Sequence, residues 1–154
     1  MDLTTNDARI ALVKKWATKY GLDPYIVCAV CEQESSWNPW AVRFEPGFLA
    51  RYVKPANPVA PTTHEIMQAC SFGLMQIMGG VALGLGWRGY FLTNLCDPDM
   101  GVDYGCRKLQ QCFERYPNED PEKALLAYNG GGNPDYGKQV LGRVVHYLPV
   151  TGAV

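Results

Sequence analysis

The chain has 154 residues, of which 47% are hydrophobic and 19% charged, and this composition is typical of one globular domain rather than a disordered chain. Its net charge of −1 argues against nucleic acid as a partner, because phosphate backbones are bound by clustered lysine and arginine. No apolar run approaches the roughly 20 residues that span a bilayer, so we expect no stable membrane insertion.

Helical periodicity and helix-start signals predict a mainly α fold that occupies residues 1–154 as a single domain. The first helix is expected from about Asn6 to Tyr20, where Gly21 ends it. The second is expected to begin after Asp23, which caps it, and to end near Ser35. Glu34 then lies in the last turn of this helix.

The rest of the chain, from Trp37 on, contains an irregular segment followed by several helices. Trp37–Pro61 is rich in proline and is expected to be irregular, and no alternating strand pattern of useful length is present anywhere. Helices are expected at Thr62–Ala69 with a capping box, briefly within Gly79–Gly89, and at Asp97–Tyr116, Asp120–Tyr128 and Tyr136–Leu148.

Six cysteines are present, and their spacing favours buried, reduced thiols. Cys28 and Cys31 lie three residues apart in a predicted helix, where geometry rarely suits a disulfide. A zinc site that adds Cys106 and Cys112 has poor ligand spacing. We therefore predict no metal and no cofactor, with disulfides and a metal site as the less favoured alternatives.

Glu34 is the candidate catalytic residue. Val27 and Val30 precede it and Trp37 follows it, so apolar groups are expected around its carboxyl. Desolvation and the negative end of the helix dipole both raise a carboxyl pKa, and an acid that stays protonated can act as a general acid. The alternative is a solvated glutamate at a helix end. Glu32 is expected to point to another face of the helix.

Two further segments place polar groups at the edge of apolar runs. In Phe72-Gly73-Leu74-Met75-Gln76-Ile77, the amide of Gln76 can donate to and accept from an acetamido or hydroxyl group, and Ser71 is a candidate partner of Glu34 or of a ligand. In Ala127-Tyr128-Asn129-Gly130-Gly131, the hydroxyl of Tyr128 is expected to contact both the ligand and the Glu34 carboxyl, with Asn129 beside it. The alternative for Tyr128 is simple packing.

Together with Glu34-Ser35-Ser36-Trp37-Asn38-Pro39, these segments resemble, in this order, the soluble lytic transglycosylases and the related goose-type lysozymes. The resemblance implies a lysozyme-like domain with a catalytic cleft that binds the glycan strand of peptidoglycan. It implies cleavage between N-acetylmuramic acid and N-acetylglucosamine, with Glu34 as sole acid and base. In the family a serine more often directly precedes the glycine, whereas Phe72 separates Ser71 from Gly73 here.

The segment Arg43-Phe44-Glu45-Pro46 is similar to phage and prophage members of this family. Glu45 is either an auxiliary carboxylate that binds substrate near the cleft or the surface partner of Arg43. The resemblance implies a transglycosylase that forms a 1,6-anhydro ring. A hydrolytic muramidase, in which Glu45, Glu65 or an aspartate places a water, and a catalytically silent wall-binding module are the alternatives.

The N-terminal residues have no basic region followed by an apolar stretch, so no secretory signal is expected. We expect a monomer that acts on the bacterial cell wall. It would reach the wall through phage lysis or as part of a virion.

Overall fold

The computed structural model describes residues 5–55, 59–117 and 120–149. Its α-helices are α1 (Asn6–Lys19), α2 (Pro24–Ser35), α3 (Pro46–Phe48), α4 (Thr63–Gln68), α5 (Gly79–Gly84), α6 (Pro98–Arg115), α7 (Pro121–Tyr128) and α8 (Tyr136–Arg143). Its strands are β1 (Val42–Phe44), β2 (Cys70–Phe72) and β3 (Ile77–Met78). A π-helical turn, η1 (Leu49–Val53), and two 3₁₀ turns, η2 (Leu92–Cys96) and η3 (Val144–His146), complete the described elements.

The mainly α class is confirmed, and the predicted caps begin the helices. The carboxylates of Asp23, Asp97 and Asp120 accept hydrogen bonds from the first backbone amides of α2, α6 and α7. Thr62 and Glu65 form the predicted capping box of α4. The last helix is shorter than predicted, because α8 ends at Arg143 and the chain continues as the 3₁₀ turn η3.

The sequence showed no alternating strand pattern of useful length, and the structure contains three short strands. The three strands form an antiparallel sheet in the order β1-β2-β3, in which Ser71 pairs with Arg43 on one side and Met78 on the other. Each strand has only two or three residues, and β2 is buried along its whole length, so no alternation of polar and apolar residues could reveal it. Part of the segment expected to be irregular forms β1, α3 and η1.

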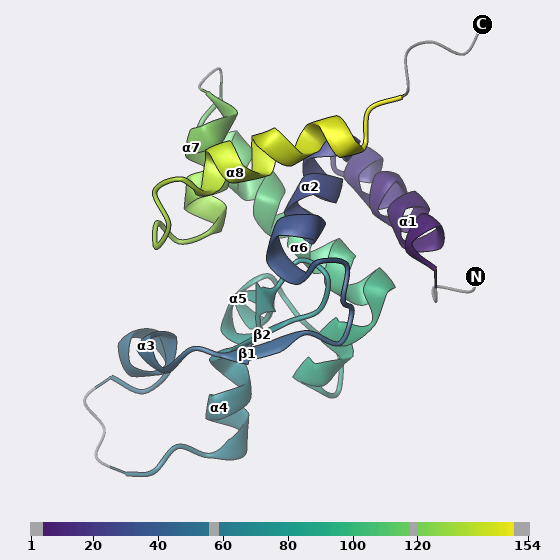
Figure 1. The fold of residues 1–154 in the computed structure, drawn as a ribbon. Helices are drawn as coiled ribbons and strands as arrows, with labels where there is room; N and C mark the ends of the chain where they lie inside the picture. Colours follow the sequence, from purple (N-terminus) through teal and green to yellow (C-terminus); the bar gives the residue numbers. More distant parts are fainter. Residues whose placement is uncertain (1–4, 56–58, 118–119, 150–154) are drawn as a thin grey trace, which may run out of the picture.

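Figure 1 shows α2 in the middle of the molecule, with α1, α7 and α8 toward one end and the sheet, α3 and α4 toward the other. Two groups of buried side chains follow this division. One joins α1, α2, α6, α7 and α8, and the other joins the sheet, α5 and η2. Because α6 contributes Val102 and Leu109 to the first group and Tyr104 to the second, it ties the two parts together.

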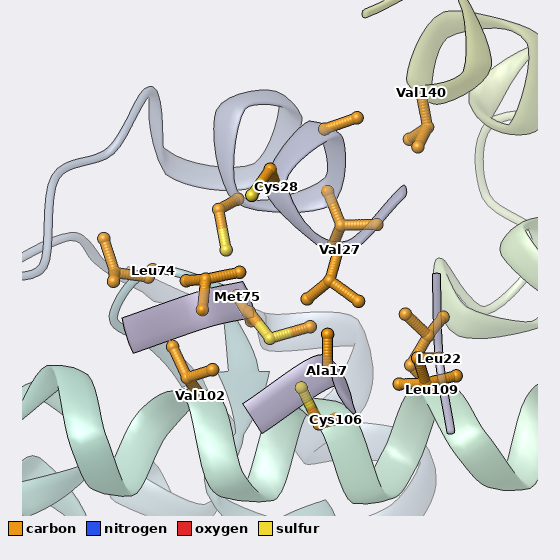
Figure 2. Close-up of a cluster of buried hydrophobic side chains, with 14 of the residues drawn as sticks. Ala17, Leu22, Val27, Cys28, Leu74, Met75, Val102, Cys106, Leu109 and Val140 are labelled. Carbon is orange, nitrogen blue, oxygen red and sulfur yellow. The ribbon is translucent and has the colours of Figure 1, made fainter. Parts of the chain in front are cut away.

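Met75 connects the turn after β2 to the helical core. Its side chain lies between α2 and α6 (Figure 2), where Gly105 of α6 leaves room for it because a Cβ there would be 2.5 Å from the Met75 sulfur. This packing fixes the position of the turn that carries Gln76.

All six cysteines are buried, as predicted, and none of them is bridged. Burial raises the pKa of the Cys28 and Cys106 thiols to about 12, so both stay protonated at neutral pH. None of the helices in the described ranges is long and apolar enough to cross a membrane.

Candidate active site

A cleft of about 1070 Å³ lies between the helical part and the sheet. One wall comes from the end of α2, the end of α7 and the start of α8, and the other comes from β1, η1 and the β2–β3 turn. The cleft is lined by every residue that the sequence singled out as a site candidate: Glu34, Glu45, Ser71, Gln76, Tyr128 and Asn129. The first and last of these residues, Glu34 and Asn129, are 95 positions apart in the chain and meet at the same cleft.

Glu34 lies in the last turn of α2, half-buried in this cleft. Its Oε1 accepts a hydrogen bond of 2.6 Å from the hydroxyl of Tyr136. Burial raises the pKa of Glu34, while this hydrogen bond and the charge of Arg43 partly oppose the rise. The carboxyl is thus a weaker acid than an exposed glutamate and has a donor ready for its ionised form.

Two strained residues end the helix directly after Glu34 and Ser35. Ser36 and Trp37 adopt left-handed backbone angles, with φ of 50° and 64°, which non-glycine residues rarely do. The Trp37 indole donates to the Tyr147 hydroxyl at 2.8 Å, and its carbonyl accepts from Arg9 at 3.0 Å. The Ser35 hydroxyl donates to the Leu74 carbonyl at 2.9 Å. These contacts hold the turn, and with it the Glu34 carboxyl, in one position.

Tyr136 was not predicted from sequence, where it is only the first residue of the last helix. It lies 102 residues from Glu34 along the chain, and no local pattern links the two. Its side chain is 2% exposed, and burial together with the Glu34 carboxyl raises the pKa of its hydroxyl, which therefore remains a donor. Only the tertiary structure brings these two residues together.

Gln76 and Ser71 have different partners from those expected. The Gln76 amide nitrogen donates to the carbonyls of Ala41 at 3.0 Å and Gly73 at 2.9 Å, and its Oε1 accepts from Ser71 at 2.8 Å. Both amide hydrogens bond to backbone carbonyls, so Gln76 ties Ala41, the residue before β1, to the β2–β3 turn instead of presenting donors to a ligand. Ser71 bonds to Gln76 rather than to Glu34, because its side chain lies within the sheet between Arg43 and Met78.

Gly73 permits this turn. It has a φ of 70°, and a Cβ on it would collide with the backbone carbonyl of Leu95. The second motif is thus a scaffold that shapes one wall of the cleft.

Tyr128 also differs from expectation. Its hydroxyl donates to the Met75 carbonyl at 2.7 Å, whereas the predicted contact to the Glu34 carboxyl is made by Tyr136. The Tyr128 ring still lines the cleft. The Asn129 side-chain oxygen accepts from the Asn133 backbone at 2.9 Å, and among the hydrogen bonds of the described residues its amide nitrogen has no acceptor.

Glu45 and Arg43 pair with each other and also lie at the cleft. They form an ion pair, with the Arg43 Nε 2.5 Å from the Glu45 Oε1, and both also line the cleft. Arg43 is close enough to Glu34 to act on its pKa. Glu65, by contrast, lies outside the cleft lining, where it closes the capping box and pairs with Lys54 at 3.1 Å.

In the described ranges, no group of three or more histidine, cysteine, aspartate or glutamate side chains could hold a metal ion. The group in the cleft best placed for proton transfer is the Glu34 carboxyl. A glutamic acid with a raised pKa, half-buried in a long cleft, is the arrangement found in enzymes that cleave glycosidic bonds by general acid catalysis.

Comparisons with known proteins agree with this class. The family model described as the transglycosylase SLT domain matches residues 11–140, so the chain belongs to this family. A protein named "Transglycosylase" from Enterobacteria phage PRD1 is 33% identical over 117 residues, which cover 76% of this chain. The chain spans only about a third of that relative, 32% of its length. No solved structure matches the chain significantly.

Proposed function

We propose that the chain is a lytic transglycosylase that cleaves the β-1,4 bond between N-acetylmuramic acid and N-acetylglucosamine in peptidoglycan. The observation that carries this proposal is the half-buried Glu34 carboxyl in the cleft, with its raised pKa and its hydrogen bond from Tyr136. Membership of the transglycosylase SLT domain family supports the same substrate class.

Protonated Glu34 would donate its proton to the glycosidic oxygen as the bond to the muramyl C1 breaks. The N-acetyl carbonyl oxygen of the muramyl unit would stabilise the resulting cation. Tyr136 and Arg43 would stabilise the carboxylate that Glu34 becomes, because both favour its ionised form. Glu34 would then take the proton of the muramyl 6-hydroxyl as that oxygen closes onto C1. The product is a 1,6-anhydro ring, and no water is consumed.

A mechanism with one carboxylate fits the surroundings of Glu34. Two-carboxylate glycosidases need a second acidic group free to act as base or nucleophile across the bond. Among the described residues, Glu45 is the other carboxylate in the cleft lining, and it forms an ion pair with Arg43. Its position nevertheless supports a second candidate function, a hydrolytic muramidase in which Glu45 leaves Arg43 and places a water.

Mass spectrometry of digested peptidoglycan separates these functions. A transglycosylase releases muropeptides that end in an anhydro sugar, lighter by one water than the reducing sugar that a hydrolase releases. Wild type is expected to give the lighter product, and Glu34→Gln to give none. If wild type releases muropeptides only at the background level, a catalytically silent wall-binding module is the remaining function.

We further propose that the protein acts on the bacterial cell wall as a monomer and reaches it through phage lysis or within a virion. The relative from a phage supports this context. Sedimentation analysis of the purified chain tests the monomer. Detection of the protein in purified phage particles would distinguish a virion protein from one released only at lysis.

A further inference from the structure

The wall of the cleft opposite Glu34 carries an aromatic and cationic group that the proposed mechanism does not use. It consists of Phe48, Arg51 and Tyr52, which all line the cleft on the segment formed by α3 and η1. The Tyr52 side chain is 64% exposed. An exposed aromatic ring inside a ligand-sized cleft is available to a ligand, and we call this group the aromatic platform.

Packing contacts position the Tyr52 ring of the aromatic platform. The rings of Phe48 and Tyr52 are 4.9 Å apart and tilted by 51°, so Phe48 supports Tyr52. Phe48 in turn packs against Gly80 of α5, where a Cβ would be only 3.1 Å from the ring. Glycine at this position therefore makes room for the ring that orients Tyr52.

The backbone under the platform is unusual as well. Leu49–Val53 form a π-helical turn, which is rare in proteins and is frequently found at functional sites. This turn places Arg51 beside the Tyr52 ring, with its guanidinium carbon 5.8 Å from the ring centre. Arg43 of the same wall is paired with Glu45, whereas among the ion pairs of the described residues Arg51 has no carboxylate partner.

We propose that the aromatic platform is a binding subsite for a peptide-bearing muramyl unit of the glycan strand. Tyr52 stacks on the sugar ring, and Arg51 pairs with a free carboxylate of the attached peptide. A sugar presents a flat face of C–H groups that suits an aromatic ring, and a guanidinium suits a carboxylate. This inference rests on the proposed function, because it names the form of peptidoglycan that the cleft prefers.

The test measures binding separately from cleavage. In a Glu34→Gln background, which cannot cleave, the chain is co-sedimented with soluble glycan strands coupled to beads. One set of strands carries its peptides, and the other has been stripped of them by an amidase. Tyr52→Ala is expected to weaken binding to both sets roughly ten-fold, whereas Tyr52→Phe keeps the ring and binds like the parent.

Arg51→Gln is expected to weaken binding to the peptide-bearing strands by about three-fold and to leave binding to the stripped strands unchanged. Arg115→Gln and Tyr90→Ala are matched controls. Arg115 is an arginine beside a tyrosine ring outside the cleft lining, and Tyr90 is 96% exposed outside it. Both controls should bind like the parent.

Binding by Tyr52→Ala equal to the parent would overturn the subsite, and an equal loss on both sets of strands for Arg51→Gln would overturn the peptide contact. Neither result depends on cleavage. Failure of the wild-type chain to release muropeptides would overturn the proposed function instead, so the two failures are distinguishable.

Discussion

Glu32 and Glu34 lie two residues apart near the end of α2, yet their carboxyls meet opposite surroundings. Glu34 faces the cleft, where burial raises its pKa despite the hydrogen bond from Tyr136. Glu32 faces η3. Burial would raise its pKa too, but hydrogen bonds with His146 and Tyr147 outweigh burial, and the pKa of Glu32 lies below its usual value.

The difference shows that environment, not residue type, gives these two carboxyls opposite pKa shifts. Glu32 accepts hydrogen bonds of 2.6 Å from Tyr147 and 3.0 Å from His146. The Tyr147 hydroxyl in turn accepts from the indole of Trp37 in the strained turn. One face of the helix end therefore supports the turn, and the other carries the proposed proton donor. The predictions below test this division.

The largest effect is expected for Glu34→Gln. The amide keeps the shape of the side chain and can still accept from Tyr136, but it cannot supply a proton. Release of muropeptides should fall by at least about 100-fold, which is the lower end of the range for losing a general acid. Measurement of initial rates on purified peptidoglycan checks this, and retention of most activity would move the catalytic acid elsewhere.

The same substitution should stabilise the fold at alkaline pH. Because the folded-state pKa of Glu34 is raised, the folded protein keeps a proton that the unfolded chain has already released. The stability of wild type therefore falls as the pH rises through this raised pKa. Glu34→Gln does not titrate at this position, so it escapes this loss of stability. Thermal unfolding at pH 4 and pH 8 should show an advantage of the variant only at the higher pH.

The second effect is expected for Tyr136→Phe, which removes the 2.6 Å hydrogen bond to Glu34. Turnover should fall roughly ten-fold, since a hydrogen bond to a charged group contributes about 1.5–3 kcal/mol and ~1.4 kcal/mol of barrier is a factor of ten. This hydrogen bond lowers the pKa of Glu34, so its loss should shift the alkaline limb of the pH–rate profile upward. Tyr90→Phe is the control, and an unshifted profile would contradict the assignment.

A smaller effect on turnover is expected for Tyr128→Phe. The substitution leaves the Met75 carbonyl without its donor, which costs about 1–3 kcal/mol of stability. The melting temperature should fall by about 2–4 °C for each kcal/mol of stability lost. Turnover should fall less than in Tyr136→Phe. A ten-fold loss of turnover without a change in melting would instead support the contact to sugar that the sequence suggests.

Tyr128 and Tyr136 show which parts of the structure could be predicted from the sequence and which could not. The helices with their aspartate caps, and Glu34 near a helix end, follow from signals that lie within a few residues of one another. The sheet has strands too short to show a period. The hydroxyl that bonds Glu34 comes from Tyr136, 102 residues away, and such a pairing depends on how α2 packs on α8.

Gln76 shows a second limit. Its amide is the kind of group that binds a sugar. The sequence gives no sign that both amide hydrogens are donated to the carbonyls of Ala41 and Gly73. A residue type shows what a side chain can do. Only the positions of its neighbours show whether that capacity is still available to a ligand.

The smallest effect on turnover is expected for Glu32→Gln, which should retain activity within about two-fold, because the residue contacts η3 and α8 rather than the cleft. The substitution should instead lower the melting temperature by about 2–4 °C, as about 1 kcal/mol of charge-assisted hydrogen bonding is lost.

The pH dependence of this loss has the opposite sign to that of Glu34. Since the folded-state pKa of Glu32 is lowered, its stabilisation is present above the ordinary carboxyl pKa and is lost as the pH falls through the lowered value. Wild type and Glu32→Gln should therefore melt together at the most acidic pH and separate near neutrality. Glu114→Gln, at an exposed position of α6, is the matched control and should melt like wild type at both. A loss of turnover as large as that of Glu34→Gln would place the catalytic acid on the other face of the helix.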